Sequence, residues 1–419
     1  MTTIPSPQGA LAGIKVLDLS RVLAGPWCTQ MLADLGADVV KVERPGLGDD
    51  TRQWGPPFLK DAEGNDTHQA SYFTACNRNK RSVTIDMATA EGQALIRQMA
   101  QQADIVVENF KVGGLKQYGL DHVSLRALNP RLIYCSVTGF GQDGPYAERA
   151  GYDLMVQAMT GMMSITGRAD GEPGGGPLRV GVAVIDLFTG LYASNAILAA
   201  LHVRDNATNG TGKGQHIDMA LLDVGMAVLA NQASGFLATG EAPGRMGNSH
   251  PSLAPYQDFP TQDGNMLLAI GNDGQFQRFC AAAGQPQWAS DPRYATNTLR
   301  VQNRGALIPA MESVTRTRST AQWIALLEDK AVPCGPINTI AQAFDDAQVK
   351  ARGLRVDLPR EAGDGIAQVS TVASPLRLSS NPPVLRHAPP ALGQHTDAVL
   401  AELGLDAQAI AALREKKVL

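Results

Sequence analysis

The sequence predicts an α/β protein with a Rossmann-like parallel sheet in a large domain and a smaller α+β domain beside it. Residues 14–43 follow the pattern strand, helix, strand, and the helix-then-strand pattern repeats twice before residue 140. Forty-three glycines, 25 prolines and 5% aromatic residues suit an α/β enzyme with tight turns better than a helical bundle. A chain of 419 residues is long enough for two or three domains.

Charge and cysteine content exclude several classes of protein. The formal net charge of -4 provides no basic field for nucleic acid. The five cysteines are scattered without a C-x-x-C pair, so we expect neither a metal site nor disulfides, and a reducing cytoplasm. The N-terminal stretch 1–13 lacks the features of a signal peptide, and no stretch reaches the ~20 strongly apolar residues of a membrane span. We therefore expect a soluble protein with no membrane partner.

The first strand-helix-strand unit lacks the fingerprint of a nicotinamide cofactor site. IKVLDLS (14–20) predicts a strand, CTQMLADLGA a helix ended by Gly36, and DVVKVE a second strand. The first turn offers Ala24-Gly25-Pro26 where a dinucleotide site has G-x-G-x-x-G. Arg44 follows the second strand, where an arginine can bind a ribose-linked phosphate.

More cations follow in CNRNKRSVTIDM. Arg78, Lys80 and Arg81 precede a predicted strand at 82–87, and together with Arg44 they suggest a phosphate-rich ligand. The alternative is an ordinary solvated group of charges.

The next elements predict where a ligand binds. A helix at 91–102 and strands in ADIVVENF and LIYCSVTG continue the alternation. Because ligands of open parallel sheets bind beyond the carboxyl ends of the strands, the loops 19–26, 43–54, 109–115 and 138–145 should share one rim. This places Asn109, Phe110, Gly139 and Gly141 near Arg44.

Asp186 is the candidate nucleophile. In RVGVAVIDLFTG (179–190) the valine-rich run predicts an extended, buried segment, and the uncharged stretch 187–203 predicts a helix. Asp186 then lies near a helix N-terminus, where the macrodipole should keep the carboxylate ionised. The alternative is that Asp186 only caps that helix.

The remaining chain predicts the domain limits. We expect a first part of the large domain at 1–225, a small α+β domain at 226–330, and a return to the large domain at 331–419. A methionine-rich helix is predicted over 150–167, a turn at Asp263-Gly264, and a final helix from Asp397 to Lys417.

Many segments in order resemble the family III coenzyme A transferases, the CaiB/BaiF group that includes formyl-CoA transferases. They are GIKVLDLSRVLAGP, KVERPGLGDDTR, NRNKRS, VENF, GYD, VAVIDLFTG, TGKGQHID, PCGPIN and LGQHTD. The resemblance implies an interlocked homodimer, coenzyme A and acyl-CoA as substrates, no permanently bound cofactor, and Asp186 as the nucleophile.

The resemblance also implies contacts with coenzyme A, to which our charge argument adds Lys80 and Arg81. The implied contacts fall on Arg21, Val22, Ala24, Arg44, Ile85, Asn109 and Phe110. Leu23 stands where formyl-CoA transferases have a glutamine, which argues against oxalate as acceptor. GNSHPSLAPYQ (247–257) replaces their glycine flap, and we expect Gly247, Asn248 and His250 to help cover the site.

Closer similarity, in VLAGP, GDDTR and GNSHPS, is to members that act on succinyl-CoA and glutarate. This implies CoA transfer from succinyl-CoA to a dicarboxylate through aspartyl anhydride and aspartyl-CoA thioester intermediates. One alternative is an α-methylacyl-CoA racemase, but Tyr152 takes the place of its histidine, and the ordinary pKa of tyrosine, ~10, is poor for proton shuttling. The other is a NAD-dependent or non-enzymatic Rossmann protein.

Overall fold

The computed structural model describes residues 9–419, which fall into two compact units. The first unit contains the chain up to residue 160, residues 181–233 and residues 347–419, and the second contains 161–180 and 234–346. These limits differ from the predicted ones, since residues 161–180 pack with the second unit and the chain returns to the first at 347. Most of the N-terminal stretch from which we excluded a signal peptide lies outside the described residues.

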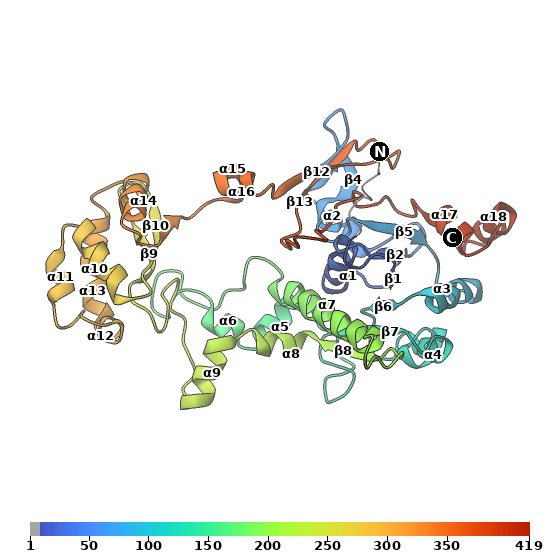
Figure 1. The fold of residues 1–419 in the computed structure, drawn as a ribbon, viewed down its shortest axis with the longest axis horizontal. Helices are drawn as coiled ribbons and strands as arrows, with labels where there is room; N and C mark the ends of the chain where they lie inside the picture. The colour runs from blue at the N-terminus through green and yellow to red at the C-terminus, as the bar shows by residue number, and fades with distance from the viewer. Residues whose placement is uncertain (1–8) are drawn as a thin grey trace. The chain divides into compact units, whose positions relative to one another are not determined.

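The first unit is built on a six-stranded sheet in which every neighbouring pair is parallel. The spatial order is β5-β2-β1-β6-β7-β8 (Figure 1). Counted along the chain this is 3-2-1-4-5-6, the order of a doubly wound Rossmann sheet, so that prediction is confirmed. The strands are β1 (Lys15–Asp18), β2 (Asp38–Glu43), β5 (Lys80–Thr84), β6 (Ile105–Glu108), β7 (Ile133–Thr138) and β8 (His216–Ala220).

Helices cover both faces of this sheet. Helices α1 (Ala24–Asp34) and α7 (Val184–Asp205) lie together on one face, and α3 (Ala90–Gln102), α4 (His122–Leu128), α17 (Thr396–Glu402) and α18 (Ala407–Glu415) lie on the other (Figure 1). The core of the second face joins residues far apart in the chain, including Leu17, Ile96, Leu400 and Val418. The predicted final helix is two helices, because the chain turns at Gly404 with φ 93°.

Shorter elements complete the first unit. They are η1 (Asp50–Arg52), β3 (Phe58–Lys60), β4 (Asp66–Ala70), α2 (Ser71–Thr74), η2 (Lys116–Tyr118), α5 (Asp153–Met159), α8 (Leu221–Ala227), α16 (Ala347–Ala351), β12 (Arg355–Pro359) and β13 (Gln368–Val372). The predicted methionine-rich helix is broken, because Gly161 (φ 87°) separates α5 from α6 (Met162–Ile165).

The second unit has its own sheet and core. Its antiparallel sheet has the order β11-β10-β9, with the predicted turn at Asp263-Gly264 joining β9 to β10. Phe259, Phe279 and Trp323 are fully buried in its core. The elements are β9 (Tyr256–Pro260), β10 (Asn265–Ala269), α10 (Asp273–Ala282), α11 (Pro286–Ser290), α12 (Asn297–Gln302), α13 (Arg304–Thr315), α14 (Thr320–Asp329), β11 (Cys334–Pro336) and α15 (Ile340–Asp345), and α9 (Ala230–Thr239) leads into it from the first unit.

Helix α7 is the one described helix that is by itself long and apolar enough to cross a membrane, a length we had not expected. The bent pair α8 and α9 passes the same test only if the two helices count as one span. In the fold, α7 packs against α1, β7 and β8. Its apolar face therefore serves the core of the first unit.

Candidate active site

Asp186 lies in the first turn of α7, which begins at Val184. The preceding residues 179–183 are irregular, and Val182 is 57% exposed, so the predicted buried strand is wrong. Val184 and Ile185, which we had assigned to that strand, are instead the first residues of the helix. The predicted position of Asp186 near a helix N-terminus is confirmed.

Asp153 caps α7 from a distance of more than thirty residues in the chain. Its Oδ1 atom accepts hydrogen bonds from the backbone N–H of Ile185 at 2.7 Å and of Asp186 at 3.3 Å. Gln157 donates to the other carboxylate oxygen at 2.5 Å. The residue before the helix, Ala183, supplies no side-chain cap, so Asp153 satisfies amides that would otherwise lack a partner.

The same contact changes the acidity of Asp186. Burial, and then the neighbouring Asp153 carboxylate, raise the pKa of Asp186 to about 7. The expectation that Asp186 stays ionised at neutral pH is therefore wrong in part, because burial and the Asp153 charge leave a large fraction of it protonated near pH 7. Burial and the Asp186 charge also raise the pKa of Tyr72 to about 12, so its hydroxyl stays protonated near Asp186.

Helix α1 begins close to the N-terminal part of α7. A Cβ atom on Gly190 would lie 2.8 Å from the carbonyl oxygen of Ala24, so only glycine permits this approach. Asp186 lies one turn before Gly190 and therefore on the same side of α7. Since α1 begins at Ala24 without a side-chain cap, the first amides of α1 have no partner within that helix.

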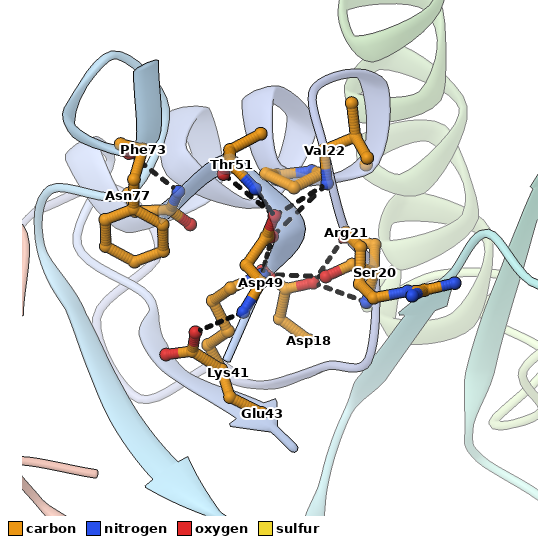
Figure 2. Close-up of polar contacts among 12 residues, drawn as sticks. Asp18, Ser20, Arg21, Val22, Lys41, Glu43, Asp49, Thr51, Phe73 and Asn77 are labelled. Atoms are coloured by element: carbon orange, nitrogen blue, oxygen red, sulfur yellow. Dashed lines mark hydrogen bonds and ion pairs between the residues drawn. The ribbon is translucent and has the colours of Figure 1, made fainter. Parts of the chain in front are cut away.

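The turn before α1 is held in an unusual conformation. Val22 has φ 69°, a left-handed value that is costly for a β-branched residue. Its backbone N–H donates to both carboxylate oxygens of Asp49 at 3.2 Å (Figure 2). Asp49 also accepts from the N–H and hydroxyl of Thr51. The strained turn is therefore fixed by a carboxylate from another loop.

Buried charges fix Asp49 in turn. Lys41 Nζ lies 2.9 Å from Asp49 Oδ2, with both side chains fully buried, and donates to the carbonyl of Ser20 at 2.7 Å (Figure 2). Burial opposes both charges, but Lys41 lowers the pKa of Asp49, and Asp49 together with Asp18 raises the pKa of Lys41. Both groups therefore stay ionised and hold the turn.

A cavity of about 500 Å³, here called the Asp186 cavity, lies wholly within the first unit. It is at the point where the strand order reverses, between β1 and β6, the usual ligand position in this fold. Arg21 and Asn109 join the two strand ends, with Arg21 N–H donating to Asn109 at 2.8 Å and Asn109 to the Arg21 carbonyl at 2.7 Å. The predicted residues that line the cavity with Asp186 are Arg21, Val22, Leu23, Ala24, Asn109, Phe110, Gly139 and Tyr152, whereas Gly141 lines neither this cavity nor the one around Arg44.

A second cavity of about 480 Å³, the Arg44 cavity, contains Arg44 and Ile85 and shares Arg21, Phe110 and Lys111 with the first. Arg44 is exposed, and in residues 9–419 no carboxylate forms an ion pair with it. The structure therefore places the predicted contact residues other than Lys80 and Arg81 in two cavities with common walls.

The expectation that Lys80 and Arg81 join Arg44 is wrong. Strand β5 begins at Lys80, two residues earlier than predicted, so these cations lie at the amino end of the strand. Lys80 is fully buried at 3.0 Å from Asp18, and Arg81 pairs with Asp38 and Glu402. Arg78 is likewise buried in a pair with Asp34.

The predicted covering loop belongs to the second unit. Gly247 N–H donates to the carbonyl of Gly167, and Asn248 donates to Asp258 at 3.0 Å. The Nδ1 atom of His250 accepts from the backbone N–H of Ser252 at 3.0 Å. These contacts order the loop within its own unit, and its role at Asp186 stays a prediction.

Several residues that line or shape the Asp186 cavity were not predicted from the sequence. Tyr72, Lys111 and Arg149 carried no local signal, because each becomes relevant only through the packing of distant loops. Asp153 was visible in the GYD segment, but its capping of α7 was not. In the described part of the chain, no three His, Cys, Asp or Glu side chains gather as metal ligands.

These features define an α/β enzyme in which a partly buried aspartate and the start of α1 line one cavity, and the Arg44 cavity adjoins it. The family model of CoA-transferase family III matches residues 11–396. The chain therefore belongs to CoA-transferase family III, and it is a CoA-transferase.

Relatives agree along nearly the whole chain. The chain is 52% identical to a succinate–glutarate CoA-transferase of Agrobacterium fabrum, covering 96% of this chain and 98% of that one. It is 40% identical to the human succinyl-CoA:glutarate CoA-transferase, covering 94% and 86%. A crystal structure of a CaiB/BaiF family protein from Brucella suis superimposes with a TM-score of 0.82 at 51% identity, covering 94% and 100%.

Proposed function

We propose that this enzyme transfers coenzyme A from succinyl-CoA to a dicarboxylate such as glutarate. The observation that carries the proposal is the position of Asp186, whose carboxylate faces a cavity shared with the CoA-binding residues expected from the sequence. The named activities of the relatives at 40–52% identity support this donor and acceptor.

The proposed reaction starts with attack of the Asp186 carboxylate on the thioester carbonyl, which forms a mixed anhydride and releases CoA thiolate. The thiolate attacks the Asp186 carbonyl, giving an aspartyl-CoA thioester and the free donor acid. The acceptor carboxylate attacks this thioester, forming a second anhydride and the thiolate. Attack of the thiolate on the acceptor carbonyl gives the new acyl-CoA and regenerates Asp186.

Each step passes through an oxyanion, for which the uncapped start of α1 beside Asp186 provides amide donors. The Arg44 cavity is proposed to hold the nucleotide end of coenzyme A. We also propose that the loop 247–253 excludes water from the anhydride, that His250 contacts the acceptor carboxylate, and that the enzyme is an interlocked homodimer. Five free cysteines fit a proposed cytoplasmic location, and no permanently bound cofactor is needed by this chemistry.

The test is mass spectrometry of the enzyme after incubation with succinyl-CoA and hydroxylamine. Modification at Asp186, together with exchange of label between succinate and succinyl-CoA, supports the proposal. An active enzyme with unmodified Asp186 refutes the mechanism. Exchange of the α-proton with solvent, without exchange of succinate, would instead identify a racemase.

A further inference from the structure

The cations around the two cavities differ in which cavity they line. Arg21 and Lys111 line both cavities, and Arg149 lines only the Asp186 cavity. Arg44 and Lys41 line only the Arg44 cavity, and Lys41 is paired with Asp49. Arg21 is also paired with Asp50 at 3.1 Å. Arg149 therefore lies in the Asp186 cavity but not in the Arg44 cavity, so a group bound in the Arg44 cavity does not occupy its site.

Aromatic rings and a tight loop hold Arg149 in position. Its guanidinium carbon lies 4.4 Å from the ring centre of Tyr146 and 5.3 Å from that of Phe140, distances that favour cation–π attraction. The loop that carries Arg149 closes on itself, because a Cβ atom on Gly139 would lie 2.5 Å from the Cα atom of Gly151. Arg149 is exposed, so these contacts favour one position of its side chain without burying it.

Apart from these two ring contacts, the charge of Arg149 has no partner of opposite sign in the described chain. No carboxylate among residues 9–419 forms an ion pair with Arg149, although the protein has many acidic side chains. A positive group left unpaired in a cavity that also contains an aspartate can offset the repulsion between that aspartate and an anionic ligand.

We propose that Arg149 binds the distal carboxylate of the dicarboxylic acyl group and thereby selects dicarboxylates over monocarboxylates. This inference rests on the proposed function, because it places the acyl group beside Asp186. A dicarboxylate bound through one thioester or anhydride keeps a second, free carboxylate. The planar guanidinium can donate two parallel hydrogen bonds to the oxygens of that carboxylate.

The test measures binding, so that it does not depend on turnover. In an Asp186→Asn background, which prevents acyl transfer, calorimetry compares succinyl-CoA with butyryl-CoA, whose acyl chain ends in a methyl group. Arg149→Met should weaken succinyl-CoA binding about tenfold or more and change butyryl-CoA binding by less than about twofold. Arg149→Lys, which keeps the charge without the planar fork, should lie between these results.

Two matched variants sharpen the comparison. Lys111→Met, at a cation shared by both cavities, should weaken both thioesters alike, and Arg131→Met, at an exposed ion pair with Asp205, should change neither. Equal loss of both thioesters in Arg149→Met would assign Arg149 to coenzyme A, and no loss would remove it from the site. Either result overturns the inference. Failure of succinate exchange in the unmutated enzyme would overturn only the proposed function.

Discussion

At the scale of single residues, the central feature is an acidic pair at the start of α7. Asp153 accepts the amides of residues 185 and 186, and its charge adds to burial in raising the pKa of Asp186 to about 7. Asp186, the proposed nucleophile, is thus partly protonated near neutral pH. The pKa of Asp186 therefore depends in part on Asp153, which accepts a hydrogen bond from its backbone N–H.

We predict that kcat/KM rises with pH to a plateau, with its midpoint near the Asp186 pKa of about 7. Asp153→Asn removes the neighbouring charge but keeps an oxygen acceptor, so the pKa of Asp186 and the midpoint should move to lower pH. Asp143→Asn, at an exposed position, is the control. Identical midpoints in all three proteins would show that Asp153 does not set this pKa.

Arg44 gives a second prediction at this scale. Arg44→Ala should weaken binding of CoA more than binding of 3′-dephospho-CoA, because the 3′-phosphate would lose its cation. Calorimetry with the two ligands measures the difference. Arg81→Ala, whose partners are Asp38 and Glu402, should affect the two ligands equally. If Arg44→Ala weakened the binding of CoA and of 3′-dephospho-CoA equally, Arg44 would not contact the 3′-phosphate.

At the scale of elements, the site depends on how α1 begins. The left-handed Val22, held by Asp49 and Lys41, directs the chain from β1 into α1 (Figure 2). Gly190 then lets α7 approach the first turn of α1. The N-terminal parts of α1 and α7 come together because Val22 adopts a left-handed conformation and Gly190 has no side chain.

Because Asp49 holds the strained Val22, substitutions of these two residues should have non-additive effects on kcat. Asp49→Asn should lower kcat by about tenfold, because Val22 would relax and the α1 amides would move away from the reacting carbonyl. Val22→Gly should be mild, since glycine adopts a positive φ without strain. In the double variant the loss from Asp49→Asn should shrink several-fold, as a double-mutant cycle of kcat would measure. Strict additivity, with thermal unfolding as the check on folding, would refute this coupling.

The sequence predicted the elements whose signals are local. Apolar patterns within short stretches predicted the strands β1, β2, β6 and β7 and the helix α3. The parallel order of these strands then predicted that the loops at their carboxyl ends lie along one edge of the sheet. Failures came where distant contacts decide the structure. Asp153 caps the amides of residues 185 and 186 at the start of α7, and Lys80 is buried beside Asp18, neither of which a local pattern reveals.

At the scale of the whole molecule, the site lowers stability. An aspartate whose folded pKa is raised to about 7 favours folding only while it is protonated. Its contribution is full below the unfolded pKa and is lost as the pH rises through about 7. The partly buried carboxylate in the Asp186 cavity therefore lowers stability at neutral and higher pH.

Asp186→Asn should therefore stabilise the protein more at pH 8 than at pH 4. After discounting for solvent in the cavity, the gain in the free energy of unfolding should be on the order of 2 kcal/mol larger at pH 8. Urea unfolding at both pH values measures it. An equal effect at pH 4 and pH 8 would contradict the raised pKa. Leu19→Ala, a buried apolar truncation, provides a comparison whose cost should not depend on the Asp186 charge.

The division of the first unit into three segments affects how the protein is made. Leu400, Ile410 and Val418 pack in the same core as Leu17 and Val106, yet the whole second unit is synthesised between them. During synthesis on the ribosome, part of one face of the parallel sheet therefore stays uncovered until helices α17 and α18 emerge. The Asp186 cavity lies in this late-completed unit, whereas the second unit has a separate core that can form earlier. Nascent chains should thus expose part of one apolar sheet face until the last helices are made, which makes them candidates for chaperone binding.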